Sequence, residues 1–417
     1  MDDEKLERVV GVPGAVLLGL GSIIGSGIFV SLGLAAEIAG SSVVVAVLIA
    51  GVVATFNGLS SAQLAASHPV SGGTYEYGYR YLHPALGFTA GWMFLCAKSA
   101  SAATAALGFA AYLLEALGGA SARLPVALGV VALFTIVTAA GIRQSNRTNA
   151  IVVSITLAAL VSLVIAGSTR VTFPRSFEHD GLLHASALMF VAFTGYGRIA
   201  TLGEEVREPQ KSIPRAIVIT LIASMVLYVA VALVAVSTIG ANSLGREAAP
   251  LEAVAARVGI RGLVAAGAIT AMLGVLLNLI LGLSRVLLAM ARRGDMPRAL
   301  ARLEGSSPRR AVLVVGVLIA AITAIGDVKT TWTFSAFNVL VYYALTNLAA
   351  LRLPREARRY PRWVAAFGLC ACLGLAFWVP MRTWLVGLAL LGLGLVWHFV
   401  RRVSAAESAP SSNDPKR

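Results

Sequence analysis

The stretch Gly19-Leu20-Gly21-Ser22-Ile23-Ile24-Gly25-Ser26-Gly27-Ile28-Phe29 lies near the middle of the first long apolar run of the chain. A second stretch, Phe190-Val191-Ala192-Phe193-Thr194-Gly195-Tyr196-Gly197, lies near the middle of the sixth run. Glycine interrupts a helix at little cost, and an interruption inside a membrane leaves peptide N–H and C=O groups that need another partner. Two such interruptions at corresponding positions of two halves indicate a transporter binding site. The alternative is that these glycines only allow helices to pack closely.

The composition is that of a membrane protein. The 417 residues are 58% hydrophobic and 13% charged, with a mean hydropathy of +0.81. A soluble domain is about 45–50% apolar and about 25% charged. A spanning helix needs about 20 apolar residues, so we predict an all-α polytopic membrane protein of about 12 transmembrane helices. The runs expected to span the membrane are 13–36, 42–66, 87–117, 124–141, 148–167, 182–203, 213–239, 262–290, 311–326, 330–352, 363–380 and 383–400.

The positive charge is distributed unequally between the two sides of these spans. With the N-terminus in the cytoplasm, 23 of the 34 Lys and Arg residues fall in cytoplasmic segments and eight in the opposite loops. The positive-inside rule therefore predicts a multi-pass protein of the inner (plasma) membrane with both termini in the cytoplasm. The net charge of +14 lies in short loops and not on one stripe, so we expect no nucleic-acid partner. Residues 1–12 are expected to be a cytoplasmic N-terminus and 403–417 a disordered tail.

Four stretches of the chain, in order, match signatures of a known family. They are Gly25-Ser26-Gly27-Ile28-Phe29; Pro69-Val70-Ser71-Gly72-Gly73-Thr74-Tyr75 with Gly87-Phe88 and Gly91-Trp92; Phe193-Thr194-Gly195-Tyr196 with Glu204-Glu205-Val206-Arg207-Glu208-Pro209 and Ile213-Pro214-Arg215-Ala216; and Arg285 with Met290-Ala291-Arg292-Arg293-Gly294-Asp295-Met296-Pro297. On these motifs the chain resembles the amino acid–polyamine–organocation (APC) superfamily of transporters over nearly its whole length.

The resemblance implies the fold of the bacterial leucine transporter, a five-plus-five inverted repeat with discontinuous helices 1 and 6. Residues 13–167 would form the first repeat and 182–352 the second, with two peripheral spans in 363–400. Five spans separate the two glycine-rich stretches, and this odd number itself requires that the two halves have opposite orientations. The resemblance also implies secondary transport of amino acids or related amines by alternating access.

The two interruptions are the predicted substrate site. A helix that restarts near Ser26 presents free N–H groups and the positive end of its dipole, which suit a carboxylate. The resemblance places the α-carboxylate of an amino acid there and its α-ammonium against freed carbonyls of both stretches. Many relatives have Glu at the position of Gly197. This chain therefore lacks an acid that those relatives have in the site. The predicted substrate-binding residues are Ile23, Ile24, Gly25, Ser26, Gly27, Phe193, Thr194, Gly195 and Tyr196.

Lys98 lies deep inside the third apolar run. A charge at that depth is unfavourable by about 2.5–3.5 kcal/mol, so a function is the default hypothesis. An amine there can bind and release a proton in each cycle or replace a fixed sodium ion. Some relatives use a lysine in the fifth span, where this chain has Thr156. We assign Lys98 to coupling; the alternative is a structural lysine that donates to backbone carbonyls of a broken helix.

Glu204 and Glu205 follow the sixth run, and Arg293 follows the eighth. An ion pair between these two groups is the predicted inner gate, and a solvated loop is the alternative.

The remaining features narrow the class of function. The sequence has no glycine-rich phosphate loop, so ATP is not expected to drive transport. We expect no cofactor, no metal site and no enzymatic activity. The favoured function is proton-coupled symport of neutral amino acids across the lipid bilayer. The alternatives are an amino acid exchanger, a cationic amino acid permease and a transporter-like amino acid receptor.

Overall fold

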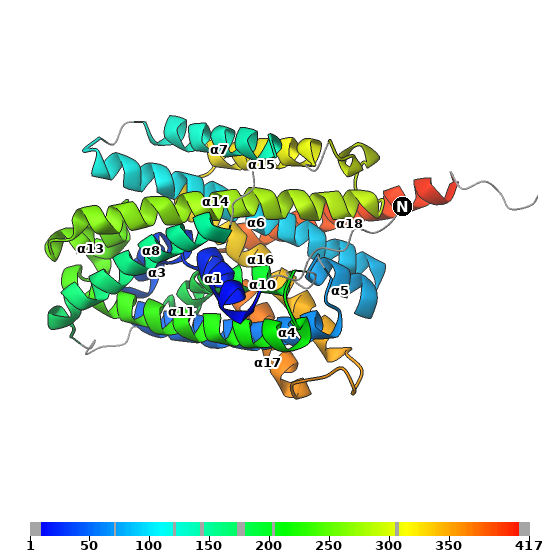
Figure 1. The fold of residues 1–417 in the computed structure, drawn as a ribbon, viewed down its shortest axis with the longest axis horizontal. Helices are drawn as coiled ribbons and strands as arrows, with labels where there is room; N and C mark the ends of the chain where they lie inside the picture. Colours follow the sequence, from blue (N-terminus) through cyan, green and yellow to red (C-terminus); the bar gives the residue numbers. More distant parts are fainter. Residues whose placement is uncertain are drawn as a thin grey trace, which may run out of the picture.

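The computed structural model describes residues 10–70, 72–119, 122–141, 146–172, 180–201, 205–304 and 308–407. These residues form helices and short connections, with one isolated β-bridge between Val10 and Val206 and no strand among them. Most of the long helices lie along the long axis of the molecule (Figure 1). The helices are α1 (Val12–Ile23), α2 (Ser26–Phe29), α3 (Ser31–Ala39), η1 (Gly40–Ser42), α4 (Val43–Ser67), α5 (Thr74–Tyr81), α6 (Pro84–Ala116), α7 (Arg123–Ala139), α8 (Asn146–Gly167), η2 (Ser168–Arg170), α9 (Leu182–Phe193), η3 (Thr194–Tyr196), α10 (Gly197–Ala200), α11 (Pro209–Ile239), α12 (Ala241–Arg246), α13 (Pro250–Arg257), α14 (Arg261–Arg292), η4 (Arg298–Ala301), α15 (Arg309–Ile325), α16 (Val328–Leu351), α17 (Arg362–Ala376) and α18 (Met381–Glu407).

Nine helical stretches within the described residues are long and apolar enough to cross a membrane. Two further apolar helices, α7 and α17, have 17 and 15 residues. Each of the twelve predicted runs contains at least one helix. Helix α18 continues to Glu407, past position 403 where the tail was expected to begin, and residues 408–417 lie outside the described residues. The prediction of a polytopic helical membrane protein is therefore confirmed at the level of its helices.

The first apolar run is broken where its glycines predict. Helix α1 ends at Ile23, Ile24 is extended (φ −81°, ψ 100°), and α2 begins at Ser26 after an extended Gly25. The sixth run differs, because α9 passes into the 3-10 turn η3 and then into α10 without an extended residue. Its glycines therefore tighten the helix and do not open it.

The first and sixth runs lie in the middle of the bundle. Helix α6 packs against α14 and α16, and α4 packs along α11, so these long helices enclose α1, α9 and α10. In Figure 1 α1 and α10 are central, while α7 and α15 lie together along one side. The outward faces carry large exposed apolar side chains such as Ile136 (65% exposed) and Val317 (70% exposed), which fits contact with lipid.

Short helices cap the two ends of the bundle. Figure 1 shows α13 at one end and α5 at the other. The hydropathy pattern did not predict these elements, because they are short and of mixed polarity. Helix α5 lies on the side that the charge distribution assigns to the cytoplasm, between the second and third spans.

Candidate functional site

The two interruptions meet at the backbone. Gly195 in η3 lies so close to the end of α1 that an added Cβ would overlap the carbonyl group of Ser22. Gly27 in α2 lies equally close to α9, since its Cβ would be 2.7 Å from the Cα of Ala192. Glycine is thus required at both points for close approach of the chains. The structure brings together the nine predicted substrate residues, and all of them except Gly195 are buried.

Two tyrosines from neighbouring helices bind carbonyls of the interruptions. The hydroxyl of Tyr228, on α11, donates to the carbonyl oxygen of Ile23 at 2.8 Å. The hydroxyl of Tyr343, on α16, donates to the carbonyl oxygen of Thr194 at 3.0 Å. A carbonyl oxygen has two lone pairs. The carbonyl of Thr194 uses both, since it also accepts the N–H of Gly197, whereas the carbonyl of Ile23 can still accept a second donor. Neither tyrosine was among the predicted site residues, because its only signal in the sequence was a hydroxyl deep in an apolar run.

Aromatic rings surround η3. Tyr343 lies 5.4 Å from the ring of Tyr196, 5.7 Å from Phe190 and 5.0 Å from Tyr342, measured between ring centroids. Tyr196 and Tyr343 are fully or almost fully buried. The hydroxyl of Tyr343 also lies 2.9 Å from the position that a Cβ at Gly197 would take. The space for a larger side chain at position 197 is therefore filled by Tyr343.

Lys98 reaches η3 from α6. Its Nζ donates to Oγ1 of Thr194 at 2.8 Å, and that hydroxyl donates in turn to the carbonyl oxygen of Val191 at 2.7 Å. The side chain is buried, with 9% of the residue exposed. Among the described residues, no carboxylate forms an ion pair with Lys98. Its partner is the hydroxyl of a predicted substrate residue, and not the backbone carbonyl that the structural alternative assumed.

The predicted gate residues are arranged differently from the expectation. Arg293 pairs with Glu76 of α5, with 2.7 Å between Nη2 and Oε2, and not with Glu205. Its guanidinium also lies 4.1 Å from the ring centroid of Tyr79. Glu205 contributes its backbone carbonyl to the N–H of Val10 at 3.0 Å. Glu204 lies outside the described residues.

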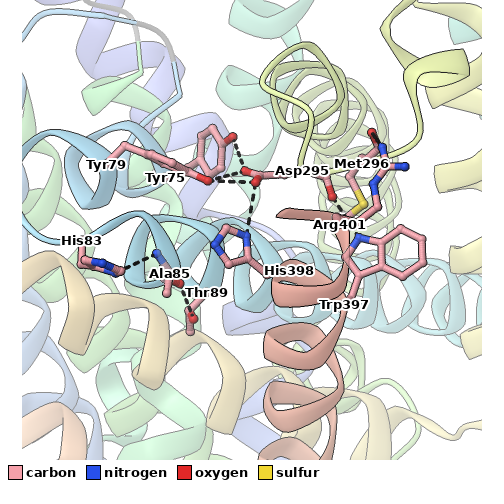
Figure 2. Close-up of polar contacts among 10 residues, drawn as sticks. All are labelled: Tyr75, Tyr79, His83, Ala85, Thr89, Asp295, Met296, Trp397, His398 and Arg401. Atoms are coloured by element: carbon pink, nitrogen blue, oxygen red, sulfur yellow. Dashed lines mark hydrogen bonds and ion pairs between the residues drawn. The ribbon is translucent and has the colours of Figure 1, made fainter. Parts of the chain in front are cut away.

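A second polar cluster, missed by the sequence analysis, surrounds Asp295 just after α14 (Figure 2). Its carboxylate accepts hydrogen bonds from the hydroxyls of Tyr75 and Tyr79, both on α5. The ring of His398, on α18, lies against the same carboxylate. The motif around Asp295 was visible in the sequence, but its partners come from elements far away in the chain.

Comparison with known proteins identifies the family. The family model for amino acid permeases matches residues 14–411. The chain belongs to the amino acid permease family. This permease is 42% identical over 412 residues to an uncharacterized transporter of Mycobacterium tuberculosis, an alignment that covers 96% of this chain and 92% of the relative. The APC resemblance drawn from the four motifs is thereby confirmed.

Two more distant relatives carry names that state what they transport. A branched-chain amino acid permease of Bacillus subtilis is 28% identical, covering 96% of this permease and 95% of the relative. A methylthioribose transporter of the same organism is 26% identical, covering 95% and 94%. The permease is thus similar along nearly its whole length to proteins named as a permease and a transporter.

Proposed function

We propose that this permease is a secondary active transporter that carries a neutral amino acid together with a proton across the inner (plasma) membrane by alternating access. The observation that carries the proposal is the hydrogen bond from Lys98 to Thr194, between a buried amine and the turn that forms half of the candidate substrate site. The amine of Lys98, which can bind and release a proton, is therefore in contact with η3, the turn that must rearrange during transport.

The proton changes the direction of this hydrogen bond. A protonated lysine has three donors and no acceptor, so it holds the Thr194 hydroxyl as an acceptor. In that state the hydroxyl donates to Val191. After the proton leaves, the neutral amine accepts a hydrogen bond, so Thr194 can turn its hydroxyl away from Val191. Coupling then follows if substrate binding favours one of these two arrangements of η3.

Three observations support a neutral substrate. Position 197 is a glycine, so it has no carboxylate that could bind a cationic side chain. The hydroxyl of Tyr343 occupies the space where a side chain at that position would extend. A cationic side chain would also meet the like charge of protonated Lys98. The relative named as a branched-chain amino acid permease supports the same class of substrate.

The packing of the helices supports twelve spans in two inverted repeats. Helix α4 packs along α11, α6 along α14 and α7 along α15. Helix α1 likewise meets η3. In each of these four pairs the second member lies five predicted spans after the first, as a two-fold relation between the repeats requires. With this arrangement we place both termini in the cytoplasm.

The test is uptake of labelled amino acids into proteoliposomes with and without an inward proton gradient. Neutral amino acids, among them leucine, isoleucine and valine, are compared with lysine and arginine. We expect the gradient to stimulate uptake of a neutral amino acid. Uptake only into liposomes preloaded with amino acid would instead establish an exchanger, and uptake of lysine or arginine alone would establish a cationic permease.

A further inference from the structure

The Asp295 carboxylate is buried at the predicted cytoplasmic end of the bundle, with 6% of the residue exposed. Tyr75 donates to Oδ2 at 2.7 Å, and Tyr79 lies 2.9 Å from Oδ1 and 2.7 Å from Oδ2. Figure 2 shows both phenol groups directed at this carboxylate. Because Thr74 at the start of α5 is also bonded to Thr346 of α16 at 2.7 Å, α5 joins the end of α14 to the centre of the bundle.

The other side of this carboxylate is covered by α18. The Nδ1 atom of His398 lies 3.4 Å from Oδ1 of Asp295, and 1% of the His398 side chain is exposed. Neither ring nitrogen of His398 has a hydrogen-bond partner among the described residues. The backbone around Asp295 is held separately, since Trp397 donates to its carbonyl at 2.9 Å and Arg401 donates to the carbonyl of Met296 at 3.0 Å.

The charges that face His398 come from three elements. Asp295 after α14 is the negative group, while Arg402 on the same helix and His83 before α6 are positive or can become so. The aromatic ring of Phe88 covers the imidazole at 4.7 Å between centroids. Arg293 pairs with Glu76, and its guanidinium lies over the ring of Tyr79. Within the described residues, His398 is the only basic side chain within ion-pair distance of the Asp295 carboxylate, and it is charged only when protonated.

We propose that Asp295 and His398 form a proton-binding lock that makes α18 part of the inner gate. This inference rests on the proposed transport function. In the neutral state this end of α18 is joined to the segment after α14 by the hydrogen bonds from the Trp397 and Arg401 side chains to backbone carbonyls. When the imidazole binds a proton, the opposite charges attract in a buried site where they are weakly screened. Protonation of His398 then strengthens the contact of α18 with Asp295, just after α14. Asp295 also binds α5 through Tyr75 and Tyr79.

The sign of the effect follows from the arrangement. The structure has the cluster assembled, so protonation of His398 stabilises the assembled state over any state in which α5 or α18 separates from Asp295. Each transport cycle needs the inner gate to open. Acidification of the predicted cytoplasmic side therefore slows transport, and this brake acts on exchange as well as on gradient-driven uptake.

The experiment measures amino acid exchange in proteoliposomes with the same pH and amino acid on both sides, at about pH 6 and about pH 8, the range in which histidine titrates. The series extends to about pH 5, the lower limit of the range in which histidine titrates. For the wild type we expect exchange to be several-fold slower at the lowest pH. His398→Gln and Asp295→Asn should both lose most of this dependence. His68→Gln is the matched control, because His68 lies at the same end of the bundle without contact with Asp295, and it should keep the wild-type profile.

A second measurement does not depend on transport. The unfolding midpoint in detergent is compared at both pH values for the wild type, His398→Gln, Asp295→Asn and the double variant. The coupling of His398 and Asp295 in the unfolding data should be stabilising at the lower pH and should vanish at the higher pH. If His398→Gln keeps the wild-type pH profile or the coupling does not change with pH, the lock is overturned. If no amino acid is exchanged by the wild type, the proposed function fails, and the unfolding data still decide on the lock.

Discussion

The Nζ atom of Lys98 lies 2.8 Å from Oγ1 of Thr194, so one hydrogen bond joins the middle of α6 to the turn between α9 and α10. The carbonyl of the same Thr194 accepts a hydrogen bond from Tyr343 of α16. Two helices, α6 and α16, therefore converge on one residue of the candidate substrate site. A change in the protonation of Lys98 acts directly on this residue, without a longer chain of contacts.

Gly195→Ala should destabilise the permease and abolish transport. The new Cβ would overlap backbone atoms of Ser22, which cannot move aside as a flexible side chain can. Overpacking of this kind is unfavourable by about 1–3 kcal/mol. Gly282→Ala on α14 is the control, since no atom lies within 4 Å of its added Cβ. Thermal unfolding and uptake are the measurements, and equal effects of the two substitutions would contradict the close contact of the interruptions.

Tyr343→Phe should destabilise the protein by about 0.5–1.5 kcal/mol, because it removes one buried hydrogen bond to the carbonyl of Thr194, which keeps the N–H of Gly197 as its other donor. Tyr360→Phe, at a half-buried position outside the bundle core, should change the free energy of unfolding by less than about 0.5 kcal/mol. Chemical or thermal unfolding in detergent measures both. A Tyr343→Phe variant as stable as the control would contradict a stabilising hydrogen bond from the Tyr343 hydroxyl to this carbonyl.

The ion-pair partner of Arg293 can be identified with double-mutant cycles that measure the free energy of unfolding. Glu76→Gln and Arg293→Gln should couple by about 0.2–1 kcal/mol, the range for a partly exposed ion pair. Glu205→Gln and Arg293→Gln should show no coupling, because the structure pairs Arg293 with Glu76. A larger coupling to Glu205 than to Glu76 would restore the gate that the sequence predicted.

Glu252 should make stability depend on pH. Burial raises the pKa of the Glu252 carboxyl above its ordinary value of 4.5, although the nearby Arg261 opposes the rise. A raised pKa in the folded state means that the stabilising contribution is complete at acid pH and is lost as pH rises through the folded pKa. The stability of the wild type relative to Glu252→Gln should therefore fall from acid to neutral pH. The same series on the exposed Glu247→Gln is the control, and a difference that rises with pH would contradict the prediction.

The sequence predicted the helical scaffold because hydropathy alone encodes spans, and glycines encode the positions of the two interruptions. It could not distinguish an open break at Gly25 from a 3-10 turn at Gly195, since glycine permits both. Lys98 was found from its depth in an apolar run, whereas its contact with the Thr194 hydroxyl depends on how α6 packs against η3. The structure pairs Arg293 with Glu76 and not with Glu205, for a related reason. Glu76 of α5 and Glu205 both lie between spans on the same predicted side, and only tertiary packing selects between them.

The most direct test of the account is the effect of an inward proton gradient on uptake by Lys98→Met, with Lys329→Met as the control. Lys329 is half-exposed and pairs with Glu37 far from η3, so the control should keep the wild-type stimulation. The account predicts that Lys98→Met still exchanges amino acid at equal pH but gains nothing from the gradient. Stimulation of Lys98→Met equal to that of the wild type would contradict the assignment of proton coupling to this lysine.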